Sequence, residues 1–407
     1  MKRFIMIFTL LICTACVYGA DDDYTAVSSG VRYQLIGTYS VDRLNLILTS
    51  ELNDFISNEN KVVFPPAKNA VKLYRVVYNT VIPEQGNRPV EASGLLAVPD
   101  TSKGNYPMVS YQHGTVFSKN EVPSYPDKSM ETRVMIAQFA GNGYIVIGAD
   151  YIGKGLSPVS DTFMVKESIA QACLDMLIAA KAVLKNQNIK SDELFVSGWS
   201  QGSWNTMIFR NKLESLGIPV KAAATACTPS DVYLMLTSYI NNPNKLDAAW
   251  LTGIFTLIIN AYESYYEDME GLSSVAIRPK YLQTARDFYN NKIGWAEASK
   301  VFPQTVAEFL QPEFAAQSSM ISNRFFKRVH ENGAYQWRYL TPSRYYYGKV
   351  DEVIRPYVAI LPVEYQKTIG GASAEAVYAG DNANHRGTFV FGVLDQKKWF
   401  DKLLESK

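Results

Sequence analysis

The sequence is poor in the residues that cross-link small proteins or bind metal ions. Its 407 residues include four cysteines and three histidines, too few for a disulfide framework or a cluster of zinc ligands. We therefore expect stability to come from a hydrophobic core, and we expect no metal ion or other cofactor. Cys173 and Cys227 lie in apolar segments, which favours two buried thiols over the alternative, a single disulfide between them.

An excess of charge of one sign is also lacking. The 40 basic and 39 acidic residues nearly cancel, so nothing indicates nucleic acid or an anionic surface as a partner. Hydrophobic residues make up 47% of the chain, which at this length is typical of one large domain with an insertion. The composition leaves the oligomeric state open.

The sequence also lacks an apolar run long enough to span a bilayer. Lys2 and Arg3 precede a short apolar stretch at residues 4–12, which has the length and charged start of a signal peptide. We predict a signal peptide at residues 1–19 and export to the periplasm or the medium. In the alternative interpretation, cleavage before Cys16 leaves a membrane-anchored lipoprotein.

What the sequence does contain is an alternation of strand and helix patterns. Residues 71–78 and 90–98 have the period-2 pattern of paired strands. From residue 107 onward, short apolar strands alternate with helical patterns at 130–139 and 168–184. This order predicts an α/β fold with a mostly parallel sheet and helices on both faces.

The alternation stops between residues 229 and 341, where helical patterns prevail. The stretch 248–259 is apolar nearly all round but too short for a membrane span, so it must be covered by protein or form the roof of an apolar cavity. We predict a helical cap at residues 229–341, inserted between a first part of the core at 20–228 and a second part at 342–407. The alternative is an ordinary second layer of helices with no role in binding.

The second part of the core repeats the strand and helix patterns. Residues 345–348 form a strand pattern, and 356–369 a helical one in which Pro362 should produce a kink or end the first turns. A last strand at 374–380 and a closing helix at about 391–404 complete the chain.

A candidate nucleophile stands where one core strand ends. The strand pattern stops at Gly198-Trp199-Ser200-Gln201-Gly202, and a helical pattern begins at once. Glycines on both sides of a serine permit the sharp strand-to-helix turn that exposes its hydroxyl, the nucleophile elbow of α/β-hydrolases. We predict Ser200 as the nucleophile.

A serine hydroxyl needs a histidine to remove its proton and a carboxylate to orient that histidine. In α/β-hydrolases the three follow in the order Ser, Asp or Glu, His. His113 precedes Ser200, and His330 precedes the strand that delivers the acid. Elimination therefore leaves His385, on a loop after the last strand, as the base.

The acid is expected just past the strand at 345–348. Asp351 stands there, and the adjacent Glu352 must point in a different direction because consecutive residues leaving a strand diverge. Asp381 is the main rival because it is closer to His385 in sequence. A turn or helix cap is its more ordinary role.

Acyl transfer also requires two backbone N–H donors for the negative oxygen of the tetrahedral intermediate. One is expected from Gln201, at the amino end of the helix after the nucleophile. The other is expected from the loop that follows the strand ending in His113-Gly114, where Thr115 is the predicted donor.

Taken as a set, these motifs resemble the secretory lipase (lipase A-like) family of α/β-hydrolases. The shared motifs, in order, are Gln112-His113-Gly114-Thr115, Ala149-Asp150-Tyr151-Ile152-Gly153-Lys154-Gly155, Gly198-Trp199-Ser200-Gln201-Gly202, Tyr347-Gly348-x-x-Asp351 and a histidine after the final strand. The resemblance runs from about residue 71 to residue 385. It implies an α/β-hydrolase fold with a cap over an acyl pocket, and an activity on carboxylic esters. By the same resemblance Ser200, Asp351 and His385 are nucleophile, acid and base.

The sequence thus predicts an exported serine carboxylic-ester hydrolase that works through an acyl-enzyme on a small-molecule, glycan or lipid ester. A lipase, an esterase and a polysaccharide deacylase would share these motifs. A serine peptidase of the same fold is the first alternative, because it uses the same triad. A non-enzymatic protein that binds lipid or glycan is the second, and the presence of all three triad residues disfavours it.

Overall fold

The computed structural model describes residues 23–406. The predicted signal peptide and Cys16 lie outside these residues. Within residues 23–406, no helix has the length and apolar character needed to cross a bilayer. Cys173 and Cys227 are both buried and unpaired, which confirms the prediction of two free thiols.

The centre of the fold is one sheet of ten strands, in the order β1-β2-β3-β4-β6-β5-β7-β8-β9-β10. From β6 to β10 the neighbours are parallel, while β1 to β4 form antiparallel pairs and β4 pairs antiparallel with β6. The strands are β1 (Thr25–Ser28), β2 (Val31–Tyr39), β3 (Val71–Ile82), β4 (Arg88–Pro99), β5 (Asn105–Gln112), β6 (Ile145–Ala149), β7 (Lys190–Trp199), β8 (Ala222–Ala226), β9 (Ser343–Tyr347) and β10 (Ala374–Tyr378).

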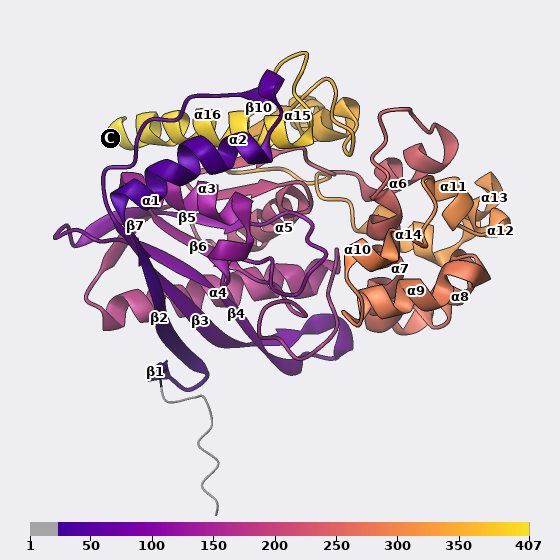
Figure 1. The fold of residues 1–407 in the computed structure, drawn as a ribbon, viewed down its shortest axis with the longest axis horizontal. Coiled ribbons are helices and arrows are strands. Elements are labelled where there is room, and N and C mark those ends of the chain that lie inside the picture. Colours follow the sequence, from indigo (N-terminus) through magenta and orange to yellow (C-terminus); the bar gives the residue numbers. More distant parts are fainter. Residues whose placement is uncertain (1–22, 407) are drawn as a thin grey trace, which may run out of the picture.

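Helices cover both faces of this sheet (Figure 1). The core helices are α1 (Val41–Leu46), α2 (Leu52–Phe55), α3 (Met130–Gln138), α4 (Lys166–Asn186), α5 (Gln201–Ser215), α15 (Pro356–Ile369) and α16 (His385–Glu405). Helices α1, α3 and α16 lie on one face, and α4 and α5 lie on the other. Strands β6 and β8 are buried along their whole length, as expected for parallel strands covered on both faces.

The predicted cap region holds the remaining α-helices of the described chain, which lie together at one end of the molecule (Figure 1). They are α6 (Val232–Asn241), α7 (Leu251–Tyr265), α8 (Leu272–Ala276), α9 (Pro279–Tyr289), α10 (Trp295–Ala298), α11 (Val306–Phe309), α12 (Pro312–Ala315), α13 (Gln317–Ser322) and α14 (Arg324–Glu331). Helix α7 contains most of the apolar stretch 248–259, and its residues are buried on nearly every side.

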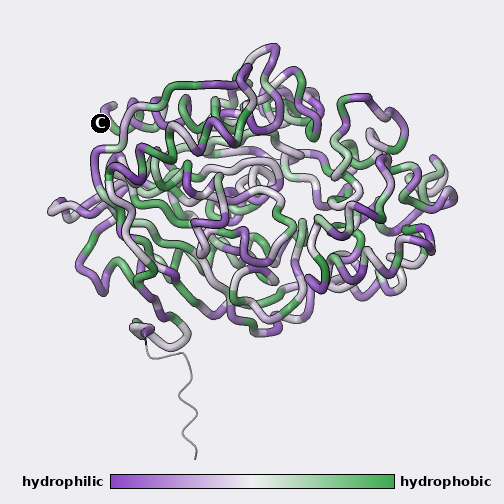
Figure 2. The backbone as a smooth tube through the Cα atoms, in the orientation of Figure 1, coloured by the Kyte–Doolittle hydropathy of each residue, from purple (hydrophilic) through white to green (hydrophobic). Residues whose placement is uncertain are grey.

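Hydropathy follows this architecture. Apolar segments gather along the strands and the inner helices, whereas polar segments prevail in the outer turns and the outermost helices (Figure 2).

The first two strands, β1 and β2, were not predicted from the sequence. Only Tyr39 is fully buried among the residues of β1 and β2, so this edge hairpin lacks the strong alternation that marks a strand covered on one face.

Two local predictions about the second part of the core need correction. Helix α15 continues through Pro362, so the proline does not end the first turns. The carbonyl of Val358, which a proline cannot bond, accepts a hydrogen bond from the Ser230 hydroxyl instead. The closing helix begins at His385 rather than near residue 391. The side chain of Asn384 accepts from the Gly387 N–H and caps this earlier start.

Candidate active site

Ser200 occupies the sharp turn between β7 and α5. Its backbone has φ 56° and ψ −125°, a strained conformation for a residue with a side chain. The flanking glycines are needed for space: a Cβ at Gly202 would lie 1.9 Å from the Gln112 carbonyl oxygen, and one at Gly198 would lie 2.2 Å from the Gly202 oxygen. This close approach of strand and helix is the geometry that the Gly-x-Ser-x-Gly motif predicts.

Asp351 and His385 form a buried pair. His385 Nδ1 lies 2.9 Å from Asp351 Oδ1 and 3.2 Å from Oδ2, and both residues are buried. Asp351 Oδ1 also accepts the N–H groups of Val353 and Ile354, each at 2.9 Å. Burial tends to raise the pKa of Asp351, but the His385 charge and these hydrogen bonds together hold it below its ordinary value. The carboxylate is therefore ionised and oriented toward the imidazole.

The backbone of His385 is held from two further sides. Its N–H donates to Glu352 Oε2 at 3.0 Å, and its carbonyl accepts the Trp199 indole N–H at 3.2 Å. Glu352 therefore bonds the main chain of the histidine, whereas Asp351 bonds its ring. Both consecutive acids reach His385, and the expectation that only one of them could do so was wrong. These contacts fix the first turn of α16 and with it the direction of the imidazole.

The other candidate residues lie elsewhere. Asp381 is exposed and pairs with Lys349 at 3.0 Å, and it also accepts the Tyr378 hydroxyl, which is the role of a turn residue. His330 lies in helix α14 of the predicted cap region, with its ring against Tyr233. Neither residue lines the cavity at Ser200.

One cluster in the described part of the chain has the composition of a metal site. Cys227, Asp351 and His385 each place a ligand atom within 4.8 Å of the others. Burial raises the pKa of the Cys227 thiol well above its ordinary value, so in the metal-free protein this thiol is protonated. The Nδ1 atom of His385 is hydrogen-bonded to Asp351, so the Asp351–His385 pair accounts for the short distances in this cluster.

The two predicted oxyanion donors lie on either side of the serine. Gln201 is the first residue of α5, and Thr115 lies on the loop after β5 and lines the same cavity as Ser200. Within residues 23–406, neither backbone N–H has a hydrogen-bond acceptor. Both donors are therefore available to a bound oxygen.

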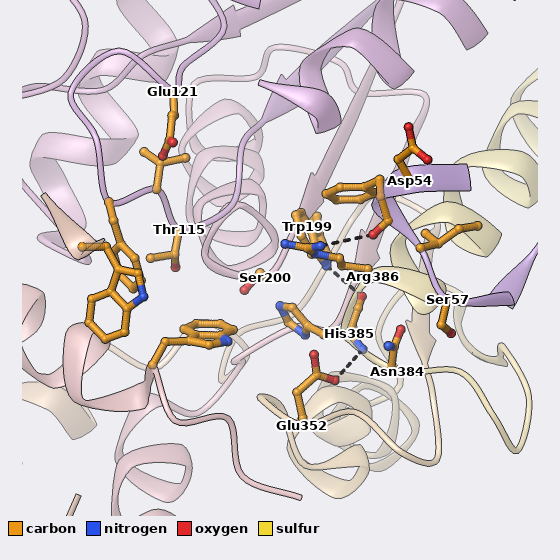
Figure 3. Close-up of a pocket in the computed structure, with 16 residues that line it drawn as sticks. Asp54, Ser57, Thr115, Glu121, Trp199, Ser200, Glu352, Asn384, His385 and Arg386 are labelled. Carbon is orange, nitrogen blue, oxygen red and sulfur yellow. Dashed lines mark hydrogen bonds between the residues drawn. The ribbon is translucent and has the colours of Figure 1, made fainter. Parts of the chain in front are cut away.

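The cavity at Ser200 has a volume of about 580 Å³. Figure 3 shows the Ser200 hydroxyl between Thr115 and His385. Apolar and polar side chains line the space in comparable measure. The aromatic ones are Phe55, Phe117, Trp199, Trp250 and Trp295, and the charged ones are Asp54, Glu121, Glu352 and Arg386. Such a mixture can hold an apolar group and a polar group of one substrate.

Sequence reasoning missed the side chains that hold residues 114–116, the loop of the predicted oxyanion donor Thr115. Lys154, which forms a buried ion pair with Asp161 at 3.1 Å, donates to the Val116 carbonyl at 3.3 Å. The carboxylate of Glu131 accepts the Gly114 N–H. Lys154 stands within the motif from Ala149 to Gly155 that carries the family resemblance, so the sequence offered a signal for its role. Glu131 stands in the first turn of α3, where an acid is common, so it carried no signal.

Comparison with protein-family models and with curated protein sequences found no match. Solved structures match nearly the whole chain. The protein lpg1103 from Legionella pneumophila aligns with a TM-score of 0.78 at 21% identity, over 92% of this chain and 98% of that one. The chain has the α/β-hydrolase fold. This confirms the predicted fold class.

Two further α/β-hydrolase structures align with the chain at lower identity. The rice cell wall degrading esterase LipA from Xanthomonas oryzae has a TM-score of 0.77 at 18% identity, over 95% of this chain and 98% of its own. Candida antarctica lipase A in its closed state has a TM-score of 0.62 at 17% identity, over 91% of this chain and 81% of its own. At these identities the alignments establish the shared fold.

Proposed function

We propose that this protein is an exported serine carboxylic-ester hydrolase in which Ser200, His385 and Asp351 form the catalytic triad. The observation that carries the proposal is the buried Asp351–His385 pair, with 2.9 Å between Oδ1 and Nδ1, beside a serine on a strained elbow in the same cavity. A pair of this kind orients a histidine and stabilises its charged form, which is what a serine nucleophile requires.

The chemistry proceeds in two halves. As the Ser200 oxygen attacks the ester carbonyl, His385 Nε2 takes the hydroxyl proton, and Asp351 stabilises the imidazolium through Nδ1. In the described chain the Ser200 hydroxyl makes no hydrogen bond with His385, and such a contact often tightens only when substrate binds. The imidazolium then protonates the leaving alcohol, and a water molecule activated by His385 hydrolyses the acyl-enzyme.

The negative oxygen of each tetrahedral intermediate would bind the N–H groups of Thr115 and Gln201. Both groups lack an acceptor within residues 23–406, so they need not break a bond before they donate. Losing one donor of this type typically lowers turnover about 100- to 1000-fold. The names of two similar structures, an esterase and a lipase, support a carboxylic ester as the substrate class.

The first experiment is a panel of p-nitrophenyl esters from acetyl to palmitoyl, assayed with residues 20–407 and its Ser200→Ala variant. We expect turnover by the wild type and a loss of at least about 1000-fold in the variant. The chain length with the highest kcat/KM separates an esterase from a lipase. Ser215→Ala is the matched control, because Ser215 is an exposed serine at the far end of α5. Full turnover by Ser200→Ala would refute the proposal.

A serine peptidase is the second candidate, and one observation favours it. Three carboxylates, those of Asp54, Glu121 and Glu352, line the cavity, against one permanently charged basic side chain, that of Arg386. An excess of negative charge in the cavity suits the ammonium group of an aminoacyl substrate. Aminoacyl p-nitroanilides assayed beside the ester panel distinguish the two, since a peptidase would prefer the anilides. Binding of a glycan or lipid without turnover of either substrate set would instead indicate a binding protein.

A further inference from the structure

The backbone next to the predicted oxyanion donor Thr115 is held by side chains from three separate segments. The peptide group between His113 and Gly114 is bonded at both ends: its carbonyl accepts the Tyr151 hydroxyl at 3.0 Å, and its N–H donates to Glu131 at 3.0 and 3.2 Å. The next peptide group is held through the Gly114 carbonyl, which lies 2.8 Å from Nδ1 of His113.

These bonds determine where the Thr115 N–H points. A peptide group is planar, and its N–H and C=O point in opposite directions. Fixing the Gly114 carbonyl on His113 therefore aims the Thr115 N–H away from that ring. Gly114 itself has no side chain to restrict its dihedral angles, and a Cβ there would lie 3.2 Å from the Trp199 ring. The orientation of both flanking peptide groups thus depends on their hydrogen bonds.

Glu131 is the unusual member of this set. Its carboxylate is buried and has no ion-pair partner within residues 23–406. Besides Gly114, it accepts the Tyr111 hydroxyl at 2.5 Å. An uncompensated buried charge normally destabilises a fold. A charged acceptor, however, binds an N–H about twice as strongly as a neutral one does, and the first turn of α3 offers it a favourable dipole.

We propose that Glu131 is a positioning residue for catalysis: by accepting the Gly114 N–H it fixes the peptide plane between His113 and Gly114. It thereby restricts the dihedral angles of Gly114, on which the direction of the Thr115 N–H toward the oxyanion depends. This inference rests on the proposed ester hydrolase function. Glu131 itself touches neither the substrate nor the reacting atoms. Its role is to keep the Gly114 N–H from turning toward the cavity and to keep the glycine in one conformation.

The test is the conservative variant Glu131→Gln. The amide oxygen can occupy the position of Oε2, which accepts from both Tyr111 and Gly114, but it is uncharged and therefore accepts more weakly. The amide NH2 then occupies the position of Oε1, 3.2 Å from the Gly114 nitrogen, where two donors face each other. We expect kcat to fall about 10- to 100-fold, with KM within about threefold and an unchanged melting temperature at pH 8. Affinity for phenylboronic acid, which forms a tetrahedral anion on the serine, should fall by the same factor as kcat/KM.

The matched control is Asp401→Asn. Asp401 also accepts a tyrosine hydroxyl, that of Tyr144 at 2.7 Å, but it lies near the far end of α16 from His385. The Asp401→Asn variant should have the same kcat as the wild type. A Glu131→Gln protein with kcat within twofold of wild type would overturn the proposal, as would a loss of kcat with unchanged boronate affinity. If Glu131→Gln does not fold, Glu131→Asp, which withdraws the charge by one methylene, should show the same loss.

Failure of the hydrolase proposal can be told apart from failure of this one. If the wild type hydrolyses no ester or anilide, the loop is measured directly by amide hydrogen exchange of the Gly114 N–H. This N–H should be protected in the wild type and exchange at least about tenfold faster in Glu131→Gln, with Asp401→Asn unchanged. Equal exchange in all three proteins would overturn the positioning role, whatever the protein's activity.

Discussion

Glu131 and His113 should produce opposite and nearly cancelling effects of pH on stability. Burial raises the pKa of Glu131 from 4.5 to about 7, although the hydrogen bonds from Tyr111 and Gly114 oppose the change. Burial lowers the pKa of His113 from 6.5 to about 4. Both groups hydrogen-bond to Gly114, next to the predicted oxyanion donor Thr115. The substitution Glu131→Gln removes one of the two opposing effects, so the free energy of unfolding of the variant should show the pH dependence caused by His113.

The magnitude follows from these values. Between pH 4.5 and about 7 the folded state holds the Glu131 proton that the unfolded chain has released, so the free energy of unfolding falls by about 1.4 kcal/mol per pH unit. The contribution is fully present below pH 4.5 and is lost as the pH rises through 7, a total of about 3 kcal/mol.

His113 has the opposite sign. Between about pH 4 and 6.5 the unfolded chain binds a proton that the folded state excludes, so the free energy of unfolding rises with pH by a similar amount. This contribution is fully present above pH 6.5 and is lost as the pH falls through 4. In the wild type the two slopes nearly offset each other between pH 4.5 and 6.5.

The assay is urea unfolding of the wild type and of Glu131→Gln at half-unit steps from pH 4.5 to 7.5, followed by tryptophan fluorescence. The free energy of unfolding of the wild type minus that of the variant should fall by about 3 kcal/mol across this range, because all other titrating groups are common to both proteins. Tyr111→Phe removes a hydrogen bond that lowers the pKa of Glu131, so it should extend the fall to higher pH. A difference that stays constant with pH would refute the reasoning.

Two further predictions concern the acid and the walls of the cavity. Asp351→Asn should lower kcat about 10⁴-fold with little change in KM, because the amide favours the wrong tautomer of His385; a loss of less than tenfold, measured on the best ester, would contradict the triad. Gly253→Val should shift the preferred acyl chain to a shorter one, because a Cβ there lies 2.8 Å from Phe117 and 3.0 Å from Trp295 and must push these cavity-lining rings inward. An unchanged chain-length profile in a folded variant would contradict this.

Much of the candidate site could be predicted from the sequence because its residues follow local rules. The elbow at Ser200 needs glycines two positions away on either side, and that spacing is visible in the chain. Only three histidines are present, so the order of the triad selected His385 by elimination. The alternation of strands and helices fixed the sheet type, because parallel strands must be joined by crossovers.

Tertiary structure decided the features that depend on residues far apart in the sequence. Helix α15 tolerates Pro362 because a hydroxyl from Ser230, remote in sequence, satisfies the carbonyl that the proline leaves free. The ring of Phe55, at the end of α2, packs edge to face against the ring of Trp199 at the elbow, and both rings line the cavity. Glu131 accepts the Gly114 N–H from a helix that begins sixteen residues after Gly114. A contact of this kind leaves no periodic pattern in the chain, because the partner is chosen by the packing of elements and not by neighbours along the backbone.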